Sequence, residues 1–425
     1  MDKFIKKKQR VIYLGNFVDD AIVAERGLPF RNAAGSNRME RIAQALKTCG
    51  FLPVILSPAI SMRARKEGPL IHQARLRLQR GIPIIFAPAL NVPILNVFTS
   101  FFFQLACLRT IIQNDRIEGV VIYNFNPSLV IICVYLKYLK RLTVLNNVED
   151  IYTPCVHDWT LQSEARAIQE TIYSFCLKLV SRIADGYIVP TKRFLDYLPE
   201  TKPFSVVTGC IKVEKRTAAC NFARDKGTLQ VLFAGKIARE HGIVEFIQAL
   251  RKLDHMDEPP SLQVDICGYG GMDEWLHEQI GTITTVRVMY HGFIPFAEYN
   301  SILSRADVCL ALQNPDGRYA NFKTPSKVYE FLGNGKAVIT TKVGDFLEMP
   351  EDSILLLDRL DALEIAGKLL LLYSDRKLLA SLQASARRHA IDNFSYSVVG
   401  KIIKNLLRIC ASRQARKGGS QVEQS

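Results

Sequence analysis

A short segment around residue 330 combines a carboxylate, a cation and a predicted helix start. Thr324 is a suitable N-cap, Pro325 suits the first helical position, and apolar residues then recur at helical spacing up to Gly333. The free N–H groups of a helix start attract anions, and Lys327 adds positive charge. Glu330 can accept hydrogen bonds from a pair of sugar hydroxyls. The segment therefore predicts a nucleotide site, with ribose on Glu330 and diphosphate at the helix start, although a solvated helix glutamate remains the structural alternative.

A second candidate anion site follows the strand predicted over residues 229–234. The chain leaves this strand through Gly235, carries Lys236, Arg239 and His241, and then enters a predicted helix. A diphosphate can bind at such a helix start when cations neutralise its charge. We therefore expect Lys236 and His241 to stabilise a departing diphosphate. Arg239 would supplement the histidine, whose reference pKa is about 6.5. Taken alone, Lys236 is also compatible with a solvated loop cation.

The first half of the chain offers two further clusters. Glu149 and Asp150 follow the strand predicted over residues 143–147 and could orient an acceptor hydroxyl or stabilise positive charge on a sugar. Gly35 and Ser36 lie in a small-residue turn before a predicted helix. Each cluster has a structural alternative, because acidic and small residues also cap helices.

Strands alternate with helices along the whole chain, which indicates parallel sheets with ligand sites at the carboxyl ends of the strands. Short β-branched and aliphatic runs predict the strands, and helical periodicity predicts the segments between them. The predicted strands are residues 10–15, 52–56, 82–86, 120–123, 143–147 and 186–189 in the first half, and residues 229–234, 263–267, 286–291, 308–312, 337–341 and 354–357 in the second.

The spacing Pro325-x-Lys327-x-x-Glu330, followed by Gly333-x-Gly335-Lys336 and an apolar strand, resembles the nucleotide-sugar site of the retaining glycosyltransferases of family 4. These enzymes, the glycosyl transferases group 1, have the GT-B fold. In that family the glutamate binds the donor ribose, which implies this role for Glu330. Many members carry an earlier partner glutamate, and its position here is Phe322.

The resemblance extends to other donor contacts. Lys236 takes the position of a family arginine and His241 that of a lysine, and Gly292 and Phe293 lie in a segment resembling the one that pairs with the base. By the same resemblance, the glycines after residue 267 would form a tight turn near the cleft. The alternative, a dinucleotide-binding glycine motif, is disfavoured because Asp273 stands where the third glycine of that motif would be. The implied donor-binding residues are Glu330, Lys327, Arg239, Thr324, Ser326, Gly292, Phe293, Gly35 and Ser36, and the implied catalytic residues are Lys236, His241, Glu149 and Asp150.

The resemblance predicts an α/β fold with two Rossmann-like domains facing a cleft. Residues 1–208 would form the acceptor-side domain and residues 209–390 the donor-binding domain. A helix over residues 391–412 would cross back to the first domain, and residues 413–425 would form a disordered basic tail.

The expected reaction is metal-independent, retaining transfer of a hexose from a nucleoside-diphosphate sugar to a hydroxyl acceptor. The acceptor would be a lipid-linked glycan in cell-surface polysaccharide synthesis, and no cofactor is expected because the nucleotide sugar is a substrate. Two other classes stay open. A sugar-nucleotide epimerase can share this fold, and a non-catalytic GT-B scaffold is compatible with Phe322.

Charge and hydropathy favour the cytoplasmic face of a membrane. The formal net charge is +14, and the ten cysteines are scattered without metal-like pairing, which is typical of a reducing cytoplasm. We expect peripheral binding to an anionic membrane surface and no nucleic-acid partner, since no nucleic-acid motif accompanies the charge.

Residues 81–108 are uncharged but interrupted by prolines, which favours a buried or surface helix over a membrane-spanning one. The basic residues beside this stretch are Arg63, Arg65, Lys66, Arg75, Arg77 and Arg80.

Overall fold

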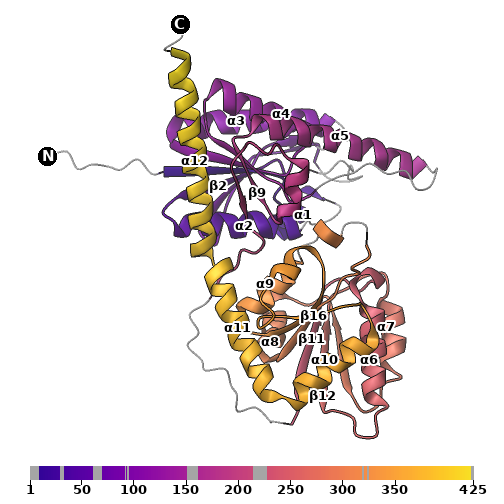
Figure 1. Ribbon diagram of the computed structural model, residues 1–425. Coiled ribbons are helices and arrows are strands. Elements are labelled where there is room, and N and C mark those ends of the chain that lie inside the picture. Colours follow the sequence, from indigo (N-terminus) through magenta and orange to yellow (C-terminus); the bar gives the residue numbers. More distant parts are fainter. Residues whose placement is uncertain are drawn as a thin grey trace, which may run out of the picture. The chain divides into compact units, whose positions relative to one another are not determined.

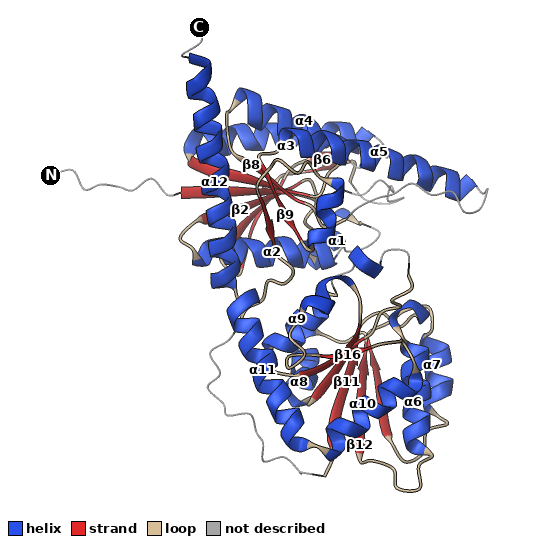
Figure 2. Cartoon of the chain, in the orientation of Figure 1, coloured by secondary structure: helices blue, strands red, loops and turns tan. Residues whose placement is uncertain are grey.

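The chain folds into two compact units (Figure 1). The first unit comprises Met1–Cys210 together with Tyr396–Ser425, and the second comprises Ile211–Ser395. The computed structural model describes residues 9–28, 33–60, 69–90, 92, 95–150, 161–213, 227–317, 320–322 and 325–422. Both units are mixed α/β, with helices around a central sheet, as the sequence predicts (Figure 2).

The first unit contains an eight-stranded sheet in the order β10-β9-β8-β7-β1-β2-β5-β4. All neighbouring strands in this sheet run parallel except β4, which pairs antiparallel with β5. The strands are β1 (Gln9–Leu14), β2 (Leu52–Ser57), β4 (Arg75–Gln79), β5 (Ile82–Phe86), β7 (Arg116–Tyr123), β8 (Val144–Asn147), β9 (Gly186–Val189) and β10 (Phe204–Val206), and β3 (Ile71–His72) pairs separately with β6 (Ala89–Leu90).

Helices cover both faces of this sheet. On one face α3 packs against α4, and α4 against α5, while α2 packs against α12 on the other (Figure 1). Right-handed crossovers explain the two layers, because the chain moves in opposite directions along the sheet from β1 to β2 and from β7 to β8. The helices are α1 (Asp20–Arg26), α2 (Ala33–Thr48), α3 (Leu95–Asn114), α4 (Pro127–Val134) with a following π-helical turn (Tyr135–Leu139), α5 (Leu161–Ile183), a 3-10 helix (Lys192–Tyr197) and α12 (Tyr396–Val422).

The last helix belongs to the first unit, as predicted for a helix that crosses back. A Cβ on Gly400 of α12 would lie 2.2 Å from the Ala45 carbonyl oxygen, so this glycine permits close packing on α2. The prediction of a disordered tail is wrong for residues 413–422, because α12 continues to Val422. Arg413 and Gln414 donate hydrogen bonds to backbone carbonyls of the first unit, which supports the added turns.

The described part of the basic cluster expected to face a membrane is paired with acidic side chains. Arg77 bonds both Asp19 and Glu25 at 3.0 Å, Arg75 bonds Glu25 at 2.8 Å, and Arg80 bonds Glu40 at 3.1 Å. Arg63, Arg65 and Lys66 lie outside the described residues. Within the described ranges no helix is both long and apolar enough to cross a bilayer.

The second unit contains a six-stranded parallel sheet in the order β13-β12-β11-β14-β15-β16. Each strand predicted from the sequence, in either half, corresponds to a strand in the structure. The elements are β11 (Leu229–Ala234), a 3-10 turn (Arg239–His241), α6 (Ile243–Asp254), β12 (Leu262–Cys267), α7 (Asp273–Ile280), β13 (Arg287–Gly292), α8 (Phe296–Arg305), β14 (Val308–Ala311), a 3-10 turn (Ala320–Phe322), α9 (Ser326–Gly333), β15 (Ala337–Thr341), a 3-10 turn (Gly344–Glu348), β16 (Leu355–Leu357), α10 (Ala362–Ser374) and α11 (Arg376–Phe394).

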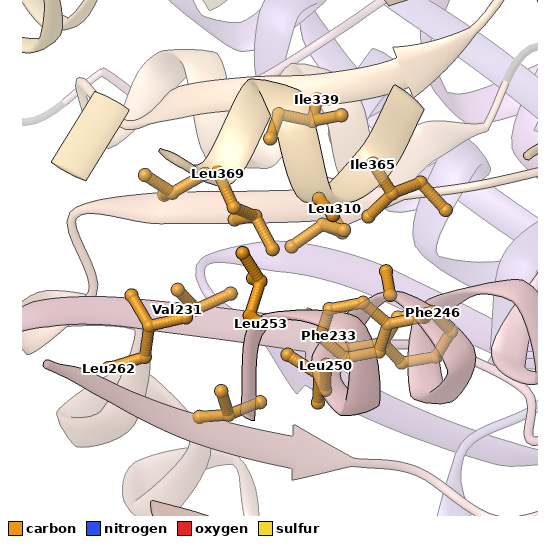
Figure 3. Packing of buried hydrophobic residues seen from close by; sticks show 14 of the residues in the cluster. Val231, Phe233, Phe246, Leu250, Leu253, Leu262, Leu310, Ile339, Ile365 and Leu369 are labelled. Carbon is orange, nitrogen blue, oxygen red and sulfur yellow. The ribbon is translucent and has the colours of Figure 1, made fainter. Parts of the chain in front are cut away.

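One core of the second unit lies between the sheet and helices α6 and α10 (Figure 3). Phe233 of β11 stacks on Phe246 of α6 with ring centroids 5.3 Å apart. Leu310 and Ile339 come from β14 and β15, and Ile365 comes from α10 (Figure 3). This packing fixes the central strands, and therefore the loops that leave their carboxyl ends.

Candidate functional site

The loops after β11 and β14 meet where the strand order of the second sheet reverses. The chain passes from β11 to β12 on one side, and it returns to place β14 on the other side of β11. The Asn314 backbone N–H donates to the Glu240 carbonyl at 3.0 Å. The Gln313 amide nitrogen lies 2.8 Å from Nδ1 of His241. Open parallel sheets bind ligands at this reversal.

Lys236 and Arg239 are exposed cations on the loop after β11. The Lys236 ammonium lies 3.0 Å from a Glu240 carboxylate oxygen, and both side chains are more than half exposed. A backbone hydrogen bond and Lys236 hold the pKa of Glu240 below its ordinary value. When the Gln313 amide donates to Nδ1 of His241, the neutral ring carries its proton on Nε2. The loop thus offers two solvent-facing cations and one oriented imidazole.

Two glycines let the loop after β12 lie directly against the loop after β11. A Cβ on Gly268 would be 1.7 Å from the Gly235 carbonyl oxygen, and one on Gly270 would be 2.0 Å from that of Ile237. The Ile237 N–H donates to the Tyr269 carbonyl at 3.1 Å. Asp273, at the third-glycine position, accepts from Gly270 N–H at 3.1 Å. These glycines therefore serve loop packing beside the cationic turn.

Replacing Gly268 by alanine is expected to destabilise the second unit by more than about 2 kcal/mol. The new Cβ would clash with the Gly235 backbone, and φ at this position is +140°. Gly271→Ala is the matched control, because nothing lies within 4 Å of its Cβ position. Thermal unfolding compares the two variants, and equal melting temperatures would contradict the proposed role of the contact.

Glu330 lies on α9 within a small polar cluster. Its carboxylate is 3.6 Å from the Lys327 ammonium, and its side chain is 16% exposed. The Lys327 ammonium also lies 3.9 Å from the centroid of the Tyr299 ring. Burial, followed by the nearby Glu330 carboxylate, raises the pKa of Tyr299 well above its ordinary value, so the phenol stays protonated. The carboxylate is thus restrained but reachable from solvent.

The start of α9 partly matches the prediction. The helix begins at Ser326, follows Pro325 and ends at Gly333, close to the predicted boundaries. The predicted N-cap is wrong by one residue, because Pro325 takes the N-cap position and Ser326 the first helical one. Thr324 lies outside the described residues, so its donor contact stays a prediction. Because α9 follows β14 and precedes parallel β15, its first turn lies at the carboxyl edge of the sheet.

Exposed aromatic side chains mark the carboxyl end of β13. Phe293 is 80% exposed and contacts Tyr269 edge-to-face, with centroids 5.5 Å apart. Gly292 has φ +64°, a left-handed conformation that glycine adopts readily. Beneath them, the buried Asp265 carboxylate bonds His291 at 2.6 Å and Arg305 at 3.0 Å. Neither Tyr269 nor this ion cluster was predicted as part of the site.

In the first unit, Glu149 and Asp150 follow β8 at the carboxyl edge of its sheet. Glu149 bonds Arg38 of α2 at 2.7 Å and the Asn147 amide at 2.6 Å. Asn124, after β7, donates to Asp150 at 2.7 Å and accepts from the Glu149 N–H at 2.7 Å. Burial, followed by repulsion from Glu149, raises the pKa of Asp150. Glu149 is therefore held by an ion pair, whereas Asp150 has a raised pKa and bonds the Asn124 amide.

Gly35 and Ser36 do not form a turn before a helix. Both lie in the first turn of α2, which begins at Ala33, and both are buried. The Ser36 hydroxyl accepts from the Val18 N–H at 2.9 Å. Their predicted donor contacts remain predictions, and any contact from Gly35 would use the backbone.

The site residues thus form two groups, one in each unit. In the second unit Lys236, Arg239 and His241 share one loop, Ser326, Lys327 and Glu330 share α9, and Gly292 and Phe293 end β13. In the described part of the chain no three His, Cys, Asp or Glu side chains gather as a metal-binding group. Metal independence and the assigned roles stay predictions.

A known family model matches most of the second unit. Residues 215–389 match the family model described as Glycosyl transferases group 1. No curated protein matches the sequence.

Solved structures show the same fold along nearly the whole chain. The sucrose-phosphate synthase of Thermosynechococcus elongatus is 14% identical, with 96% of this chain and 100% of that chain covered and a TM-score of 0.62. Anabaena HepE in complex with UDP-glucose is 15% identical, with coverage of 94% and 99% and a TM-score of 0.60. WaaG, a glycosyltransferase involved in lipopolysaccharide biosynthesis, is 13% identical, with coverage of 92% and 98% and a TM-score of 0.56. The chain therefore has the GT-B fold, and its residues 215–389 match the family model of the glycosyl transferases group 1.

Proposed function

We propose that this protein transfers a hexose from a nucleoside-diphosphate sugar to a hydroxyl acceptor, with retention at the anomeric carbon. The observation that carries the proposal is the restrained Glu330 carboxylate on α9, on the same sheet edge as an exposed cationic loop. A carboxylate that binds ribose hydroxyls and cations that bind a diphosphate form a donor site of matching chemistry. The match to glycosyl transferases group 1 and the UDP-glucose complex of HepE support it.

In this proposal each part of the donor has its own contacts. Glu330 binds the ribose, while Lys327, Ser326, Thr324 and the start of α9 bind the diphosphate with Lys236, Arg239 and His241. The exposed ring of Phe293 and the backbone of Gly292 receive the base. Gly35 and Ser36, at the start of α2, are the contacts proposed from the first unit.

The bond between the anomeric carbon and the diphosphate oxygen breaks, and the acceptor oxygen bonds to the same face of that carbon. Lys236, His241 and Lys327 stabilise negative charge on the leaving diphosphate, and no metal ion is required for that role. The acceptor hydroxyl proton passes to the departing phosphate oxygen. Asp150 orients that hydroxyl, and Glu149 fixes the loop through Arg38.

The proposed acceptor is a lipid-linked glycan at the cytoplasmic face of a membrane, as in polysaccharide assembly. The net charge of +14 supports attraction to an anionic surface. The scattered cysteines fit a reducing compartment, and the described ones are free thiols.

Thermal stabilisation by UDP, GDP, ADP and dTDP, measured with EDTA present, tests the donor site. One nucleotide is expected to raise the melting temperature, since ligand at 100 times its dissociation constant adds about 2.7 kcal/mol. Turnover of the matching labelled sugar nucleotide then separates the functions. Transfer or slow hydrolysis supports a transferase, epimerisation would favour an epimerase, and absence of both binding and turnover in folded protein would favour a scaffold.

A further inference from the structure

The helical layer of α3, α4 and α5 exposes a broad set of large apolar side chains. Phe98 and Phe102 of α3 are 64% and 65% exposed, and Ile168 and Phe175 of α5 are 62% and 60% exposed. Between these helices, Ile131 of α4 and Leu139 of the π-helical turn are 52% and 73% exposed. These six residues define the α3–α4–α5 face.

The apolar residues of this face form outward stripes on neighbouring helices. Phe98 and Phe102 lie one turn apart, and Ile168 and Phe175 lie two turns apart. The three helices lie side by side on one face of the sheet (Figure 1). Large exposed apolar side chains gathered on one layer mark an interaction site in soluble proteins.

Basic side chains lie at one end of the same layer. Each helix leads into the next parallel strand, so the C-terminal ends of all three meet at the amino edge of the sheet. Arg109, Lys140, Arg141, Lys178 and Arg182 lie at these ends and are exposed. None of the five forms an ion pair with an acidic side chain among the residues that the structure describes.

Negative charge is scarce on this layer. Residues 95–114 and 127–141 contain no Asp or Glu, and Glu170, the acidic residue in the part of α5 whose side chains the structure describes, is buried. The nearby Asp115 and Asp185 are paired with Arg10 and Lys137. Among the described side chains of this layer, a second copy of this chain would bring no exposed, unpaired carboxylate to neutralise the basic ends. The headgroups of anionic lipids carry the negative charge that these ends require.

We propose that the α3–α4–α5 face binds an anionic lipid bilayer. The apolar stripes enter the boundary between headgroups and acyl chains, and the basic helix ends contact lipid phosphates. The inference rests on the proposed function only in that a lipid-linked acceptor would be presented at such a surface. It assigns the contact to this layer instead of to Arg75, Arg77 and Arg80, which are paired with acids.

Co-flotation of the full chain with phosphatidylcholine vesicles, with and without phosphatidylglycerol, tests this surface. The protein is expected to float with the anionic vesicles and to be released by salt. Phe98→Ser with Phe102→Ser should weaken binding at least tenfold, a loss of about 1.4 kcal/mol, because two large apolar side chains no longer enter the bilayer. Leu76→Ser with Leu78→Ser on edge strand β4 is the matched control, because these leucines are 73% and 74% exposed elsewhere in the same unit.

The basic ends are tested separately. Lys140→Ala with Arg141→Ala should weaken binding about 30-fold, which corresponds to about 1 kcal/mol per cation. Lys252→Ala with Arg388→Ala, two exposed cations of the second unit, should leave it unchanged. Circular dichroism checks that each variant is folded.

The proposal would be overturned if the variants of the α3–α4–α5 face and their controls lost vesicle binding equally. It would also be overturned if folded wild-type protein did not float with the anionic vesicles. A concentration-dependent dimer that Phe98→Ser with Phe102→Ser abolishes, without vesicle binding, would assign the face to a second copy instead. Nucleotide binding is measured on the same samples. Vesicle binding without nucleotide binding would refute the transferase proposal and leave this surface standing.

Discussion

Glu330→Ala is expected to abolish thermal stabilisation by the nucleotide and to lower kcat/KM by at least about 100-fold. Hydrogen bonds to a charged group contribute roughly 1.5–3 kcal/mol each, and the proposed carboxylate binds two ribose hydroxyls. The side chain lies beside Lys327 and Tyr299, so its removal also leaves the Lys327 ammonium without its carboxylate partner. Melting curves with and without nucleotide, together with steady-state rates, measure both effects.

Two further variants make this result specific to ribose binding. Glu330→Gln keeps a hydrogen-bond acceptor and should lose less than Glu330→Ala. Glu278→Ala removes an exposed glutamate from α7 in the same unit and should change neither measurement. If Glu330→Ala retains full stabilisation by the nucleotide, the ribose role of this glutamate is wrong.

The strands were predictable because a buried parallel strand is a short, nearly continuous apolar run. Edge strand β4 was missed because it is not such an apolar run. Its sequence alternates arginine with leucine, which the charge analysis interpreted as a basic cluster, and its outward leucines stay exposed. Helix α1 was also missed, although Asp19 caps it and Gly27 ends it in the left-handed conformation.

The local parts of the candidate site were predictable, but their partners were not. The α9 helix start and the glycine turn after β11 depend on neighbouring residues, so their sequence patterns carry the signal. Tyr299, Gln313 and Arg38 reach the site through tertiary packing. Arg38 and Glu149, for example, are separated by 111 positions in the chain. No spacing rule links such residues in a single sequence.

Arg38 and Glu149 belong to a continuous network of polar side chains in the first unit. The Tyr13 hydroxyl donates to Asn147 at 2.6 Å, the Asn147 amide donates to Glu149, and Glu149 pairs with Arg38. Arg38 also donates to the Val207 carbonyl. Burial alone would lower the pKa of Arg38, and the Glu149 carboxylate more than offsets this, so the guanidinium stays charged. The network joins β1, β8 and α2 beneath the proposed acceptor loop.

Glu149→Ala is therefore expected to lower the free energy of unfolding of the first unit by about 3–5 kcal/mol, because it leaves a largely buried guanidinium without its counter-charge. Urea titration measures this loss, and Arg38→Met with Glu149→Leu should cost less than the sum of the single changes. Asp115→Ala is the matched control, since the more exposed Arg10–Asp115 pair should contribute less than about 1 kcal/mol. Equal losses of stability for Glu149→Ala and Asp115→Ala would contradict the stabilising role of the network.

Nucleotide binding by folded Glu149→Ala should persist, because Glu330 and the cationic loop lie in the second unit. That result would separate a structural role of Glu149 from donor binding.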